Sequence, residues 1–126
     1  MFRSNHLDDA LEGADVVVMA VVSGGVEGVT KLALPGIAKA KALWLTSKGF
    51  CKFPDGRIEQ LPTAIRQIGR DEGYTVPPIV AIAGPVKANE CAARKPTATI
   101  FGCKDGELAL KYACAAYRKL CDRCHG

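Results

Sequence analysis

The stretch ADVVVMAVV, residues 14–22, decides the fold class because it is apolar and rich in β-branched side chains. Apart from Asp15, it shows no alternation of apolar and polar residues. A strand without alternation is buried on both faces, as in a parallel sheet that helices cover on both sides. We therefore expect a strand near residues 15–22 in a layered protein of helices and strands.

Three more apolar runs predict strands further along the chain. They lie near residues 42–47, 79–83 and 97–102. Segments with helical spacing of apolar residues separate all four runs, and the connections are short. This alternation favours an α/β fold in which the four strands form one mainly parallel sheet with helices on both faces.

Glycine and proline suggest where the helices end. A helix over residues 8–13 is expected to end at Gly13, and one that starts at Val26 is expected to stop at Pro35. Residues 51–57 contain Pro, Asp and Gly and are expected to form a surface loop. The remaining predicted helices lie over residues 58–69, 88–93 and 107–120.

The composition excludes several classes of protein. The chain has 126 residues, of which 48% are hydrophobic and 24% charged, so it has ordinary globular usage and room for one domain. No apolar run approaches the roughly 18 to 20 residues that span a bilayer. The net charge of +4 comes from scattered residues, which argues against a nucleic-acid surface. No apolar leader follows Met1, so we expect a cytoplasmic protein.

The six cysteines are expected to be reduced, since a cytoplasmic chain does not normally form a disulfide framework. Cys91, Cys103 and Cys114 lie among apolar residues and are predicted to pack as small hydrophobic side chains. Dinucleotide-binding sheets usually open with Gly-x-Gly-x-x-Gly between a strand and a helix. The chain contains no such sequence, and residues 23–28 have the wrong glycine spacing for it. The pattern is that of half a dinucleotide-binding fold.

Three segments together resemble the NAD(P)-dependent glycerol-3-phosphate dehydrogenases. They are residues 10–21, then residues 45–50 with their Lys-Gly pair, and finally residues 83–90 together with Pro-Thr-Ala at 96–98. Their order and spacing match the family over residues 7–112. The resemblance implies a partial Rossmann-like fold, with residues 1–120 as the C-terminal half of an NAD-binding domain and residues 121–126 as an unmatched tail.

The resemblance also implies the roles of individual residues. Lys48 matches a lysine that contacts both substrate and cofactor, and Gly84 and Val86 match the turn that meets the substrate. Ala88 matches an alanine that contacts the cofactor, NAD or NADP. Gly25 lies where some members place an aromatic residue beside the nicotinamide. Val86 replaces a polar residue of many bacterial members, which leaves only its backbone as a donor.

The position of Lys48 supports a role without reference to the family. It ends an apolar strand, and ligands of open α/β sheets bind beyond the carboxyl ends of the strands. A fixed cation there stabilises a phosphate or a developing alkoxide. The other interpretation is a solvated lysine at a strand end. The resemblance assigns proton acceptance to a different lysine, in a helical domain that this chain lacks, so Lys48 is expected to act electrostatically.

The activity implied is the interconversion of sn-glycerol 3-phosphate and dihydroxyacetone phosphate by hydride transfer. The fingerprint strand and the helical substrate domain of the family are missing, so a truncated or split product that is inactive alone is expected. Its partners would be a small phosphorylated substrate and the missing halves as separate chains.

Two other functions remain open. A remnant of the fold that only associates with a partner is one. The sequence Cys121-x-x-Cys124-His125 also fits haem attachment, a metal site or a dithiol pair, although no second Cys/His pair completes a zinc site. We expect no metal.

Overall fold

The computed structural model describes residues 5–84 and 87–124, with side chains as far as Tyr117. The chain divides into two compact units, residues 1–79 and residues 80–126. In the first unit the elements in chain order are α1 (Leu7–Leu11), β1 (Val16–Met19), the 3-10 turn η1 (Ser23–Gly25), α2 (Val26–Ile37), β2 (Ala42–Leu45), β3 (Phe50–Lys52), β4 (Ile58–Gln60) and α3 (Leu61–Asp71).

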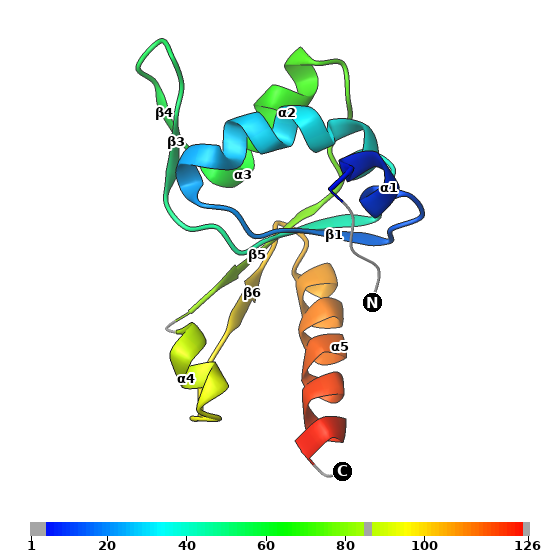
Figure 1. Ribbon diagram of the computed structural model, residues 1–126, viewed down its shortest axis with the longest axis vertical. Coiled ribbons are helices and arrows are strands. Elements are labelled where there is room, and N and C mark those ends of the chain that lie inside the picture. Colours follow the sequence, from blue (N-terminus) through cyan, green and yellow to red (C-terminus); the bar gives the residue numbers. More distant parts are fainter. Residues whose placement is uncertain (1–4, 85–86, 125–126) are drawn as a thin grey trace. The chain divides into compact units, whose positions relative to one another are not determined.

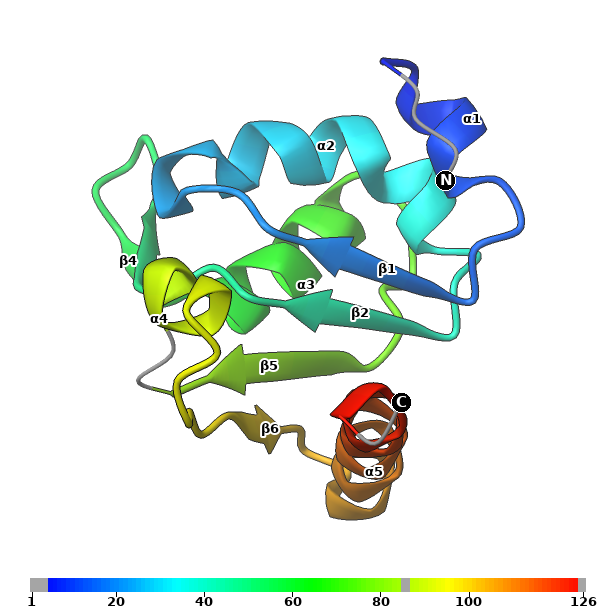
Figure 2. The ribbon, with the colours of Figure 1, turned by 60° about the horizontal axis from the view of Figure 1, so that its bottom comes forward.

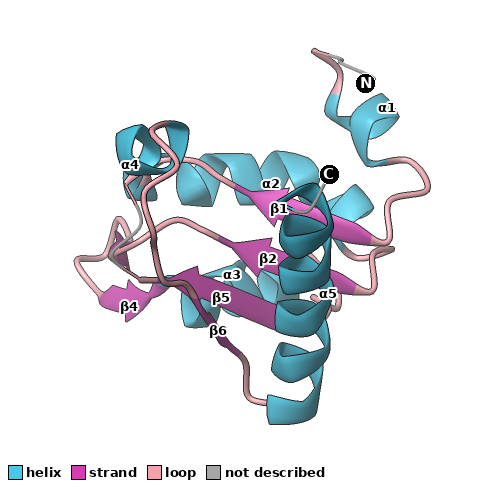
Figure 3. Cartoon of the chain, turned by 90° about the horizontal axis from the view of Figure 1, so that it is seen from below, coloured by secondary structure: helices cyan, strands magenta, loops and turns pink. Residues whose placement is uncertain are grey.

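The second unit carries most of β5 (Ile79–Ala83), followed by α4 (Ala88–Ala92), β6 (Ile100–Gly102) and α5 (Gly106–Cys124). The predicted α/β class is confirmed, because helices alternate with the strands of a mixed sheet. β1 and β2 run parallel (Figure 2), whereas β5 and β6 run antiparallel (Figure 3). The sequence did not reveal this reversal, since a strand's residues do not encode its direction.

The core of the first unit lies between β1 and β2 and the helices α2 and α3, which pack side by side on one face of these strands (Figure 1). Each helix presents a buried stripe that recurs every three or four residues, the pattern of an amphipathic helix. Helices on the second face of the sheet stay a prediction. Among the described residues of this unit, the largest fully buried side chains are those of Leu34, Ile37, Leu43, Leu61, Ile65, Val26 and Thr30.

The strand predicted for residues 15–22 is shorter and less buried than expected. β1 covers only Val16–Met19, and burial alternates along it: Val17 and Met19 are buried, but Val18 is 53% exposed. The prediction of burial on both faces is therefore wrong for β1. It holds better for β2, where three of the four residues are buried.

Two more local predictions are wrong. α2 does not stop at Pro35 but continues to Ile37, and the Ala38 amide still donates to the Leu34 carbonyl at 2.9 Å. A proline in the last turn removes a single amide and leaves the later hydrogen bonds in place. α3 begins at Leu61, three residues later than expected, because residues 58–60 form a strand.

The expected surface loop at residues 51–57 is a β-hairpin. β3 and β4 pair antiparallel, and the Phe53 amide donates to the Arg57 carbonyl at 2.9 Å. Cys51 and Phe53 are buried in the core. The strands have three residues each, so the alternation that would indicate them is too short to recognise. The turn needs Gly56, whose φ is +89°.

The prediction about cysteine packing is wrong for Cys91 and Cys114. Cys91 and Cys114 are exposed and Cys103 is half-buried, whereas Cys51 is buried. An apolar sequence neighbourhood on a helix does not decide which face a residue occupies.

Candidate functional site

The carboxyl ends of β1 and β2 meet in register at Met19 and Leu45, as expected for the ligand-binding edge of a parallel pair. Directly after β2, the Thr46 amide and hydroxyl both donate to the Met19 carbonyl, at 3.1 and 3.3 Å. The Ser47 hydroxyl accepts from the Val21 amide at 3.3 Å and donates to the Val21 carbonyl. Side chains thus continue the strand pairing where the regular ladder has ended.

The turn after β1 leads directly into the N-terminus of α2. Within η1, the Gly25 amide donates to the Val22 carbonyl at 2.9 Å, and Val26 then begins α2 fully buried. In this part of the described chain no side chain caps α2 by a hydrogen bond. A Cβ at Gly25 would meet Val22 Cγ2 at 4.0 Å, an ordinary contact. The turn therefore has no side chain at Gly24 or Gly25.

Lys48 lies beside this turn. It is exposed, and the next residue, Gly49, has a φ of +103°. A Cβ at Gly49 would lie 3.8 Å from Cβ and Oγ of Ser23, so the Lys48–Gly49 segment runs against η1. The structure thus brings two of the predicted site residues, Lys48 and Gly25, to neighbouring loops at one edge of the first unit.

The second unit holds the other predicted residues. Gly84 directly follows β5 with a φ of +132°, and a Cβ there would lie 2.6 Å from the Ala98 carbonyl oxygen. Glycine is needed on both counts. Ala88 begins α4 and is exposed, while Val86 lies outside the described residues. The backbone at Gly84 thus lies against the backbone of Ala98 and Thr99, at the end of the Pro-Thr-Ala segment.

Cysteine chemistry is disfavoured near this edge. Burial, and to a lesser degree the charge of Glu27, raises the pKa of the Cys51 thiol, so the thiolate is a minor species at neutral pH. Glu27 itself pairs with Lys31 at 3.1 Å. No group of three or more His, Cys, Asp or Glu side chains with the geometry to hold a metal occurs among the described residues.

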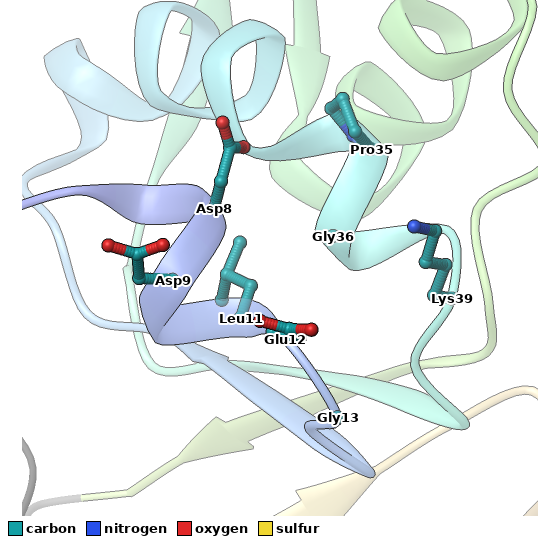
Figure 4. A pocket seen from close by; sticks show the side chains of 8 residues that line it. All are labelled: Asp8, Asp9, Leu11, Glu12, Gly13, Pro35, Gly36 and Lys39. Carbon is teal, nitrogen blue, oxygen red and sulfur yellow. The ribbon is translucent and has the colours of Figure 1, made fainter.

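A pocket of about 490 Å³ lies at the opposite end of β1 and is lined by charged side chains (Figure 4). Asp8, Asp9 and Glu12 line it from α1 and the residue after it, and Lys39 lines it from the segment that follows α2. These segments lead into the amino ends of β1 and β2. Ligands of open α/β sheets bind at the carboxyl ends, so this pocket is not the expected site.

The Cys-x-x-Cys-His sequence falls at the end of the described chain. Cys121 and Cys124 belong to the last turns of α5, and His125 lies outside the described residues. In the part of the chain that the structure covers, no helix is both long and apolar enough to cross a membrane.

Comparison with known proteins identifies the family. Residues 1–109 match the family described as the N-terminus of NAD-dependent glycerol-3-phosphate dehydrogenase. The chain belongs to this family. The match covers the whole first unit and the second unit as far as Ala109, so both Lys48 and Gly84 lie within it.

Curated relatives agree with the family match. The chain is 35% identical over 101 residues to the NADP(+)-dependent glycerol-3-phosphate dehydrogenase of Archaeoglobus fulgidus. The aligned region covers 80% of this chain and 29% of the relative. Glycerol-3-phosphate dehydrogenase [NAD(P)+] of Bacillus velezensis is 32% identical, over 82% of this chain and 28% of the relative. The enzyme of the same name from Syntrophomonas wolfei is 35% identical, over 75% of this chain and 26% of the relative. The chain therefore spans less than a third of the length of these relatives.

Thr46 and Ser47 are parts of this edge that the sequence did not clearly indicate. Their signal is weak but present: two hydroxyl residues directly follow an apolar strand and precede Lys48. A hydroxyl at that point can replace a backbone partner when neighbouring strands diverge.

Proposed function

We propose that this chain is the C-terminal half of the NAD(P)-binding domain of a glycerol-3-phosphate dehydrogenase. That enzyme interconverts sn-glycerol 3-phosphate and dihydroxyacetone phosphate by hydride transfer. The observation that carries the proposal is the family match over residues 1–109, combined with the placement of Lys48 beside η1 at the carboxyl edge of two parallel strands. Residues 121–126 form a tail outside the match.

In this proposal Lys48 holds a negatively charged oxygen of the substrate. The contacts of Thr46 and Ser47 hold the backbone next to Lys48, and its ammonium group would make a charge-assisted contact to the phosphate or the hydroxyl oxygen. By the resemblance, we also assign Gly84 and Val86 to contact with the substrate. The proton acceptor is supplied from the family's helical domain, and Lys48 does not take that role.

We assign the nicotinamide end of the cofactor to this edge. In this proposal NAD or NADP supplies or accepts the hydride, and Gly25 lies on the nicotinamide side without an aromatic side chain of its own. Ala88 lies at the start of α4 and would contact the same cofactor. The sequence has no Gly-x-Gly-x-x-Gly, so the pyrophosphate must be held by residues of another segment. The working enzyme would be cytoplasmic and would need those segments, in the same chain or as partner chains.

The test is an enzyme in which residues 1–109 replace the matching part of the Archaeoglobus fulgidus relative. We expect oxidation of NADPH or NADH that depends on dihydroxyacetone phosphate, with the unaltered relative as the positive control. Dihydroxyacetone without its phosphate should be a poor substrate, because the Lys48 contact needs an anion. A chimera that has the circular dichroism of a folded protein but no such activity would contradict the proposal.

A second candidate function is a non-catalytic module that binds a partner through β1. An apolar groove of about 270 Å³ runs beside this strand, lined by Leu7, Leu11 and Val29 among others, and it reaches the exposed Val18. β1 is also the last strand in its sheet as far as the structure describes the chain. Under this hypothesis the chimera would fold and remain inactive with every phosphorylated substrate.

A further inference from the structure

The hydroxyl of Ser47 forms hydrogen bonds with both backbone polar groups of a single residue, Val21. It accepts the hydrogen bond of the Val21 amide at 3.3 Å and donates its own to the Val21 carbonyl. The two residues are 26 positions apart in the sequence. β1 ends at Met19 and β2 at Leu45, so this side chain performs the pairing that backbone atoms perform within the ladder.

The contact lies between the two loops that carry the candidate site. Val21 precedes turn η1 by two residues, and Ser47 immediately precedes Lys48. The Lys48–Gly49 segment also runs against Ser23, at 3.8 Å from a Cβ placed on Gly49. This hydroxyl thus links the backbone next to Lys48 to the segment that leads into η1 and α2.

Thr46 does not replace this contact. Its amide and hydroxyl both bind the Met19 carbonyl, at the end of the regular ladder, and so fix the strands rather than the loops beyond them. Without the Ser47 hydroxyl, the half-buried Val21 amide and carbonyl would both lose a partner. Such groups are costly to leave unpaired, so the loop would move to regain water or another partner.

We propose that Ser47 is a positioning residue of the site: its hydroxyl holds η1 and the Lys48–Gly49 segment at a fixed spacing, and so places Lys48 for its anionic ligand. The role toward the ligand rests on the function proposed above. The spacing itself does not, and it can be measured in the 126-residue chain without any ligand.

The experiment compares the wild type with Ser47→Ala and Ser47→Thr by nuclear magnetic resonance of the isotope-labelled chain. Thr75→Ala, at an exposed residue of the same unit, is the control. Two quantities report the spacing: the exchange rate of the Val21 amide and the proton contacts between Gly49 and Ser23. In Ser47→Ala we expect exchange to accelerate about fivefold, as for the loss of one net hydrogen bond, and the contacts to weaken. Ser47→Thr keeps a hydroxyl and should restore both.

The same samples are then titrated with sn-glycerol 3-phosphate while the amide signals of Lys48 and Gly49 are followed. We expect Ser47→Ala to weaken the apparent affinity about fivefold and Ser47→Thr to recover it. Thr75→Ala should match the wild type in affinity and in melting temperature. Unchanged exchange and contacts in Ser47→Ala would overturn the proposal, as would a changed spacing with an unchanged affinity. If the isolated wild type does not respond to the phosphate, the same variants are compared as chimeric enzymes. An inactive wild-type chimera means that the proposed function fails, whereas the exchange and contact data alone decide whether Ser47 sets the spacing.

Discussion

Replacing Gly84 by alanine should destabilise the second unit for two separate reasons. The φ of +132° lies in a region that residues with a Cβ rarely adopt, which costs about 1–3 kcal/mol. The new Cβ would also lie 2.6 Å from the Ala98 carbonyl oxygen and 3.3 Å from Thr99 Cα, both backbone atoms that cannot rotate away. Forcing such an overlap costs a further 1–3 kcal/mol or so, for a total of about 2–6 kcal/mol.

Gly73→Ala is the matched control, because Gly73 has a φ of +79° and a Cβ there would meet no atom within 4 Å. It should lose only the cost of the left-handed backbone, about 1–2 kcal/mol. The assay is urea unfolding followed by circular dichroism, with native-state hydrogen exchange of β5 and β6 to locate the loss. If Gly84→Ala is no less stable than Gly73→Ala, the close approach of residues 84 and 98 is not present in solution and the reasoning is refuted.

Three further predictions concern the core, the hairpin and the cofactor. Leu34 is 1% exposed and Leu32 69%, so in thermal or urea unfolding Leu34→Ala should lose about 3–5 kcal/mol and Leu32→Ala less than about 0.5 kcal/mol, and equal losses would contradict the assigned core. The backbone amide of Arg57, and to a lesser degree its side chain, lowers the pKa of the exposed Asp55. The ionised carboxylate therefore stabilises the fold above the ordinary carboxyl pKa, and this stabilisation is lost as the pH falls through the lowered pKa. In a carbon-detected titration, Arg57→Gln should raise that pKa only in part, since the amide remains; full recovery of the ordinary value would contradict this order of causes. By calorimetric titration the chain alone should bind NADH much more weakly than about 1 μM, or −8 kcal/mol, because it has no Gly-x-Gly-x-x-Gly; micromolar affinity would mean that the dinucleotide is held elsewhere.

The fold class could be predicted because long apolar runs and helical spacing are properties of single segments. The details that failed depend on what lies next to a segment. Whether Val18 is covered depends on the packing around β1, and the hairpin at Phe50–Gln60 depends on Cys51 and Phe53 reaching a core formed by distant helices. Pro35 remains within α2 because the surrounding hydrogen bonds and packing outweigh one lost amide.

The candidate site was predicted partly by chemistry and partly by resemblance. The carboxyl end of an apolar strand pointed to Lys48 without any relative, and the structure places it beside η1. The requirement for glycine at residue 84 could not be predicted from its neighbours, because it arises in part from Ala98, fourteen residues later in the segment that leads into β6. Ser47 was missed because a serine after a strand is common, and only the pairing with Val21 distinguishes it. The convergence of Lys48 with Gly84 and Ala88 remains part of the proposal.

The central claim is that Lys48 makes a placed contact with the substrate, and the chimeric enzyme tests it most directly. We predict that Lys48→Ala lowers kcat/KM for dihydroxyacetone phosphate by about 2–4 kcal/mol, or roughly 30- to 1000-fold, by analogy with the loss of one oxyanion donor. Lys87→Ala removes the same charge from an exposed position at the start of α4 and should change kcat/KM little. Equal losses in the two variants would show general attraction of an anion instead of a placed contact, and would contradict the account.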